Sequence, residues 1–128
     1  MRHFILSALL LILLSFALPA IAEMHVSRAV LCSGVEDLEP VETVENVTAD
    51  MGQIYFFAEI KEAGEESQIK HIWYYNDDPV AEIPITVSGP RWRTYSYKAL
   101  SENMTGEWHV DVVDENGNVL QSVPFTVK

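Results

Sequence analysis

The sequence is poor in cysteine and in basic residues. It has a single cysteine, Cys32, so no disulfide can form within the chain. Eight lysines and arginines stand against 19 acidic residues, which gives a formal net charge of −11. Nucleic-acid binding needs a basic surface, and so does electrostatic attachment to an anionic membrane. We therefore expect neither nucleic acid nor a lipid surface as a partner.

Long hydrophobic runs are absent except in the first 22 residues. Arg2 and His3 precede an uncharged run at 4–18, and the small-residue pattern 20–22 follows, as in a signal peptide cleaved after Ala22. We expect one domain at 23–128, with seven basic residues, 19 acids and a charge of −12. The protein should be periplasmic or secreted. Alternatively, the N-terminal helix stays uncleaved and anchors the protein, and this helix would then be the protein's only contact with the membrane.

Helical periodicity is scarce as well, because apolar residues mostly recur at every second position. Turn signals separate the alternating stretches about every ten residues, which predicts an immunoglobulin-like antiparallel β-sandwich preceded by the signal-peptide helix. A small closed barrel is the alternative architecture. We expect a long loop, or an irregular edge segment that crosses between the sheets, at 34–50, and a helical turn within 99–105. The seven strands are expected at 25–33, 53–60, 69–75, 80–87, 91–98, 108–112 and 119–127.

Period two also assigns side chains to faces. In 53–60 the even-numbered residues should share one face and the odd-numbered ones the other. In 25–33 four residues should share a face: Val26, Arg28, Val30 and Cys32. Tight turns are expected at 76–79 and at 114–117, where Asn, Asp, Pro and Gly are the residues that turns favour.

The strongest candidate site combines aromatic and basic residues on two strands that we expect to be neighbours. Four of the seven basic residues after the signal segment lie at 69–75 and 91–98. Arginine forks beside aromatic rings can hold carboxylates or phosphates and stack on planar groups. The ligand-binding candidates are His71, Trp73, Tyr75, Arg91, Arg93 and Tyr95.

Each of these residues also has a purely structural interpretation. A sandwich needs a buried tryptophan, which Trp73 or Trp108 would supply. The arginines would then neutralise acids on adjacent strands. We expect no cofactor and no metal, because the histidines show no ligand spacing. We assign no catalytic residue, since no nucleophile with a matching base is recognisable, and a small hydrolase is the least favoured interpretation.

Five groups of short blocks stand out along the chain: 26–29 with Gly34, Val35 and Pro40; 54–57; 71–75; 89–93 with Ser96 and Lys98; and 106–108 with 114–117. These blocks resemble a bacterial family catalogued as domain of unknown function 2914. The resemblance spans essentially all of 23–128, and the order of the blocks is its most specific part. It implies an exported or membrane-tethered β domain, and it carries over no catalytic residue.

We therefore expect a non-catalytic binding module of the cell envelope. Its ligand would be a cell-wall glycan or an anionic polymer, held by the aromatic and arginine side chains. The alternative is a protein-interaction or assembly module, which docks on an envelope protein through an edge strand or through the acidic segment 36–50.

Overall fold

The computed structural model describes residues 22–128, and strands make up nearly all of its regular structure. The predicted signal peptide, apart from Ala22, lies outside the described residues. Two short 3₁₀ turns interrupt the strands, at Ala49–Met51 and Glu102–Met104, and the second lies within the stretch predicted to hold a helical turn. The strands are β1 His25–Glu36, β2 Glu39–Thr43, β3 Gln53–Lys61, β4 Ser67–Tyr75, β5 Asp78–Val87, β6 Arg91–Ala99, β7 Gly106–Asp114 and β8 Val119–Val127.

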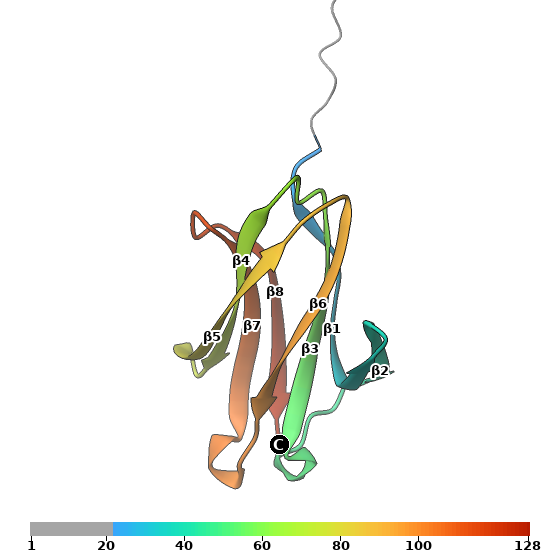
Figure 1. Ribbon diagram of the computed structural model, residues 1–128. Helices are drawn as coiled ribbons and strands as arrows, with labels where there is room; N and C mark the ends of the chain where they lie inside the picture. Colours follow the sequence, from blue (N-terminus) through green and yellow to red (C-terminus); the bar gives the residue numbers. More distant parts are fainter. Residues whose placement is uncertain (1–21) are drawn as a thin grey trace, which may run out of the picture.

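The strands form two antiparallel sheets of four that face each other (Figure 1). Sheet A has the order β2-β1-β3-β6, and sheet B has the order β5-β4-β7-β8. The prediction of an all-β fold made of antiparallel strands is confirmed. No helix within 22–128 is long and apolar enough to cross a membrane.

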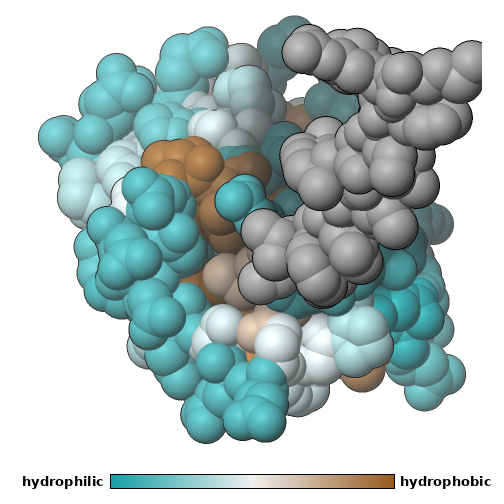
Figure 2. All heavy atoms as spheres, turned by 90° about the horizontal axis from the view of Figure 1, so that it is seen from above, coloured by the Kyte–Doolittle hydropathy of each residue, from teal (hydrophilic) through white to brown (hydrophobic). Residues whose placement is uncertain are grey.

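The core lies between the sheets, where alternate residues of each strand point inward. Ile54, Phe56, Ala58 and Ile60 of β3 are fully buried in it, as the alternation predicts. Sheet B contributes, among others, Trp73 from β4. Seen from the end at which β1 begins, a narrow hydrophobic strip lies between hydrophilic side chains (Figure 2). Such a strip is expected where two sheets have apolar inner faces and polar outer faces.

The eighth strand, β2, was not predicted; it is an edge strand of sheet A within the segment expected to be a loop or an irregular edge crossing between the sheets. It pairs with the end of β1 through a two-residue turn at Asp37 and Leu38, whose φ angles are 50° and 56°. Such hairpin turns usually contain Gly, Asn or Asp at both positions, because φ is positive there. A leucine in this conformation is unusual, so residues 37–38 do not carry a clear turn signal.

The predicted face of β1 is also wrong. A bulge between Val26 and Arg28 shifts the register against β3, so the side chains change faces at this point. Val26 packs against the core, and beyond the bulge Ala29 and Leu31 do so. Arg28, Val30 and Cys32 instead pair with the outward-facing residues of β3, so these three lie on the outer face of sheet A.

The β1–β2 hairpin folds back over this outer face. β1 pairs with β3 only as far as Cys32, and from Cys32 onward it pairs with β2. If β1 were straight, Arg28 would lie about 25 Å from the hairpin turn and thus far from Glu39, which follows that turn. The carboxylate of Glu39 instead lies 3.0 Å from the guanidinium of Arg28, so the hairpin bends back toward the start of β1. The fold-back explains why Cys32 and Phe57 are fully buried although both face away from the main core.

Candidate functional site

The six candidate site residues do not share one surface. We expected 69–75 and 91–98 to be neighbouring strands, and that prediction is wrong, because β4 lies in sheet B and β6 in sheet A. Period two predicts which residues of one strand share a face, but it carries no information about strand pairing. β5 and the turn at 88–90 take the chain across to the other sheet before β6 begins.

His71 and Trp73 lie between the sheets and are fully buried. Both rings contact one hydroxyl of the opposite sheet, that of Ser96 on β6. Trp73 Nε1 donates a hydrogen bond to Ser96 Oγ at 3.1 Å, and His71 Nδ1 lies 2.8 Å from the same oxygen. These two residues therefore connect the sheets inside the core and are not available to an external ligand.

The surroundings of His71 are almost entirely apolar apart from Ser96. An indole N–H can only donate, so the Ser96 hydroxyl accepts from Trp73, and the same oxygen is hydrogen-bonded to His71 Nδ1. The other ring nitrogen, Nε2, is buried without a hydrogen-bond partner among the described residues. Burial lowers the pKa of His71 to about 4, so the ring is neutral at pH 7.

Tyr75 is also held in place by its surroundings. Its hydroxyl donates a hydrogen bond to the carbonyl oxygen of Thr105 at 2.8 Å. Its ring packs against Trp108, with 5.1 Å between ring centroids. Tyr75 thus ties the end of β4 to the connection that precedes β7.

The arginine candidates point outward from sheet A and are engaged by two glutamates. Glu39 accepts hydrogen bonds from Arg28 at 3.0 Å and from Arg93 at 2.7 Å. Glu59 accepts one from Arg91 Nε at 2.7 Å. The hydrogen bonds from Arg28 and Arg93 lower the pKa of Glu39 to about 2. Hydrogen bonds from Arg91 and Ser27 hold the pKa of Glu59 below its usual range. This network fastens the β1–β2 hairpin to the sheet.

The same outer face carries an open group of tyrosines, which we call the tyrosine face: Tyr55, Tyr95 and Tyr97. Tyr55 is paired with Tyr97 across β3 and β6, and Tyr95 follows two residues earlier on β6. The ring centroid of Tyr55 lies 5.3 Å from that of Tyr97 and 6.1 Å from that of Tyr95. Tyr95 and Tyr97 are 43% and 58% exposed. Only Tyr95 was predicted, although the alternation in 53–60 already separated Tyr55 from the face of Ile54 and Phe56.

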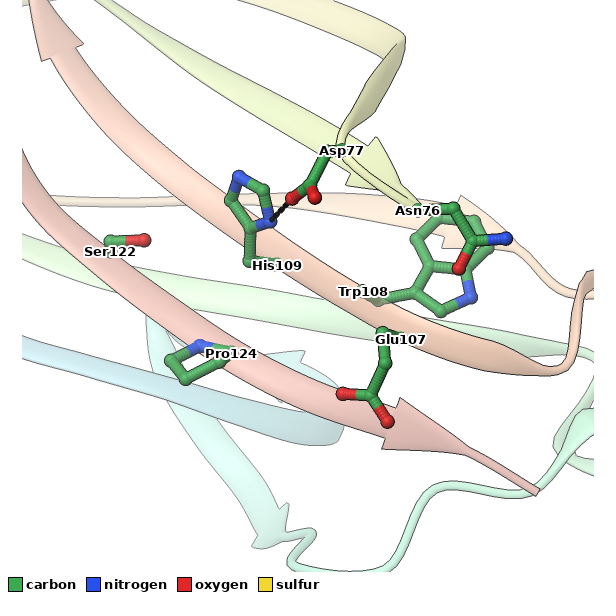
Figure 3. A pocket seen from close by; sticks show the side chains of 7 residues that line it. All are labelled: Asn76, Asp77, Glu107, Trp108, His109, Ser122 and Pro124. Atoms are coloured by element: carbon green, nitrogen blue, oxygen red, sulfur yellow. Dashed lines mark ion pairs between the residues drawn. The ribbon is translucent and has the colours of Figure 1, made fainter.

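A shallow pocket of about 500 Å³ lies on the outer face of sheet B (Figure 3). His109 lines it and stacks on Tyr74 at 4.3 Å between ring centroids. The two ring nitrogens of His109 lie 3.9 Å from Asp77 and 4.0 Å from Asp111. One carboxylate oxygen of Asp111 is buried and has no hydrogen-bond partner within 22–128. This pocket is acidic and thus differs from the tyrosine face.

The described part of the chain offers few side chains arranged for binding a metal ion or for thiol chemistry. No group of three or more His, Cys, Asp and Glu residues within 22–128 is arranged to hold a metal ion. The thiol of Cys32 is buried, and burial raises its pKa, which keeps it in the protonated, weakly nucleophilic form. The tyrosine face and the acidic pocket are two of the open features of the described structure.

Comparison with models of protein families finds a match to part of the chain. No curated protein shows significant similarity to the chain. The blocks at 26–29 and 54–57 lie outside the segment matched by the family, whereas those at 71–75, 89–93 and 106–117 lie inside it. Residues 66–127, which run from just before β4 to the end of β8, match the model of the family described as Protein of unknown function (DUF2914).

Proposed function

We propose that the protein is an exported, non-catalytic binding module that recognises a cell-envelope glycan through the tyrosine face. The observation that carries the proposal is the exposure of Tyr95 and Tyr97 beside Tyr55 on the outer face of a regular sheet. Tyrosine combines an apolar ring, which covers the C–H face of a sugar, with a hydroxyl that can hydrogen-bond to it. Each ring extends from a paired strand, so binding would need little ordering of the backbone.

An uncharged glycan fits this face better than an anionic polymer does. The guanidinium groups of Arg91 and Arg93, which were candidates for phosphate or carboxylate binding, already donate to Glu59 and Glu39. The domain after the signal segment carries a charge of −12, which would repel an anionic chain. Stacking on neutral sugar rings needs neither free arginines nor a basic surface.

A non-catalytic role agrees with the position of the most strongly perturbed histidine. The environment of His71 lowers its pKa strongly, but the ring is enclosed between the sheets and cannot reach a substrate. Its perturbed pKa follows from burial in the core and does not indicate acid–base chemistry.

We propose further that the fold is immunoglobulin-like and that residues 23–128 form one domain exported by a cleaved signal peptide. Support for the fold comes from the two sheets, the buried tryptophan of β4 and the chain's repeated crossing between sheets. Export would place the protein in the periplasm or outside the cell. Sequencing the N-terminus of the protein recovered from the envelope should give Glu23; an intact Met1 would support a membrane-anchored helix instead.

Sedimentation with insoluble glycans tests the proposed ligand. Protein should co-sediment with purified peptidoglycan sacculi or with chitin, and Tyr97→Ala should weaken this binding about fivefold, as expected for losing about 1 kcal/mol of aromatic contact. Tyr74→Ala is the matched control, because Tyr74 stacks on His109 on the other sheet. Equal loss in both variants, or no binding to either glycan, would contradict the proposal.

A protein-interaction module is the second candidate, and one observation favours it. β6 is an edge strand of sheet A, so one side of its backbone is unpaired in the described structure. The acidic segment 36–50 is less suited to docking than the sequence suggested, because it contains β2 and because Glu39 is engaged by Arg28 and Arg93.

A further inference from the structure

The free edge of β6 can be defined residue by residue. In an antiparallel pair, successive residues alternate between pointing both backbone groups at the partner strand and pointing both away from it. Leu100 donates its N–H to Gly52, and Pro90 accepts from Glu62, so even-numbered residues of this region face β3. The backbone groups of Arg91, Arg93, Tyr95, Tyr97 and Ala99 therefore point to the open edge.

The other three edges are protected against pairing. Native sheets block edges with proline, short strands, bulges and charges. β2 has five residues and includes Pro40, and β5 includes Pro79 and Pro84. β8 includes Pro124 and a register shift against β7. β6 has no proline, no bulge and no acid, and it pairs with β3 without interruption over all nine residues; its charges are those of Arg91, Arg93 and Lys98.

The position of β6 in the sandwich leaves this edge accessible. β5 and β6 are the edge strands on the same side of the two sheets, and they diverge from the turn that joins them (Figure 1). The half of β6 that holds Tyr95 and Tyr97 is thus the half farther from β5.

We propose that β6 pairs with β6 of a second copy of this chain, antiparallel and in register about Tyr95. This register is the one that overlaps all nine residues and aligns the outward-pointing backbone groups of the two strands. It sets Tyr95 opposite Tyr95 of the partner, Arg93 opposite Tyr97, and Arg91 opposite Ala99. Every arginine therefore faces an uncharged residue, and Arg93 faces an aromatic ring.

Charge supports a second copy at this edge. The exported domain carries a charge of −12, so two copies repel each other over most of their surfaces. At β6 the repulsion is weakest, because the strand has no acid and because Arg91 and Arg93 balance Glu59 and Glu39. Since the remaining repulsion is long-range and screened by ions, the dimer should tighten when salt is raised.

The pairing would join two four-stranded sheets into one sheet of eight strands with a two-fold axis at Tyr95. Because Tyr55, Tyr95 and Tyr97 all lie on the outer face, the tyrosine faces of the two copies would become one continuous surface. A long polymer would then contact both copies at once, which raises its apparent affinity. The dimer itself does not depend on what this surface binds.

Cysteine crosslinking tests both the dimer and its register. In a Cys32→Ala background, Tyr95→Cys places two thiols opposite each other at a Cα separation of about 5.5 Å, within the range of a disulfide. Tyr97→Cys is the matched control, because the paired register separates its two copies by about 13 Å along the strands. We expect at least tenfold more disulfide-linked dimer from Tyr95→Cys than from Tyr97→Cys on a non-reducing gel.

Sedimentation velocity of the wild-type protein and of Tyr95→Lys completes the test. The wild type should sediment as a dimer that strengthens with salt, whereas Tyr95→Lys should be a folded monomer, since it sets two like charges opposite each other. A monomeric wild type, a dimeric Tyr95→Lys protein, or equal crosslinking at both positions would overturn the proposal. A monomer that still binds chitin would refute the dimer and leave the proposed function intact.

Discussion

The burial of His71 predicts a pH dependence of stability that one substitution should remove. The pKa of His71 is about 4 in the folded protein and about 6.5 in an unfolded chain. The unfolded state therefore binds more protons between these values, and stability falls as pH falls. The contribution of His71 is fully present above pH 6.5 and is lost as pH decreases toward 4. Between pH 7 and pH 5 the loss should be about 2 kcal/mol.

Urea unfolding followed by tryptophan fluorescence measures this loss, since Trp73 is buried next to the histidine. The comparison variant is His71→Asn, whose side-chain oxygen can still accept from Ser96 but cannot titrate. The wild type should lose about 2 kcal/mol more than His71→Asn between pH 7 and pH 5. The same pH dependence in both proteins would refute the assignment of a neutral, buried His71.

Three further predictions concern the outer face of sheet A and the last hairpin. Phe57→Ala should lower the free energy of unfolding by about 3–5 kcal/mol, whereas the exposed Tyr97→Ala should change it by less than about 0.5 kcal/mol; similar losses in urea unfolding would contradict the covered position of Phe57. Glu39→Gln should speed amide exchange at 33–43 more than Glu42→Gln, which removes the same charge without touching Arg28 or Arg93; equal exchange would show that the network does not fasten the hairpin. Gly117→Ala should cost about 1 kcal/mol by thermal unfolding, because φ at this position is +83°, and an unchanged melting temperature would argue against that turn.

Local patterns predicted most of the strands and several faces. The alternation in β3 placed Ile54 and Phe56 on one face, which lies in the core, and the turns at 76–77 and 114–117 lie where their residues indicated. These features depend on neighbours in the sequence, so a single sequence contains the necessary information. β2 was missed because its hairpin turn contains Leu38 in a left-handed conformation, which local preferences disfavour.

The candidate site depended on which strands are neighbours in a sheet, and local sequence patterns do not specify this. The aromatic and basic strands β4 and β6 are not neighbours, because they lie in opposite sheets, and Ser96 connects their inner sides. The fold-back of the β1–β2 hairpin brings Glu39 into contact with Arg93, which is 54 residues away in the sequence. No local sequence pattern predicts that contact. The bulge after Val26 reverses the faces of β1, and a one-residue shift of this kind is invisible to period-two analysis.

The central claim is that the tyrosine face is the binding surface. Mapping the binding site of a soluble glycan on the protein by NMR tests this claim most directly. Titration of ¹⁵N-labelled protein with chitohexaose should shift the amide signals of β3 and β6 around Tyr55, Tyr95 and Tyr97 in a saturable manner. The signals around His109 on the opposite sheet should stay unchanged. Shifts centred on the His109 pocket, or no saturable shifts anywhere, would contradict the account.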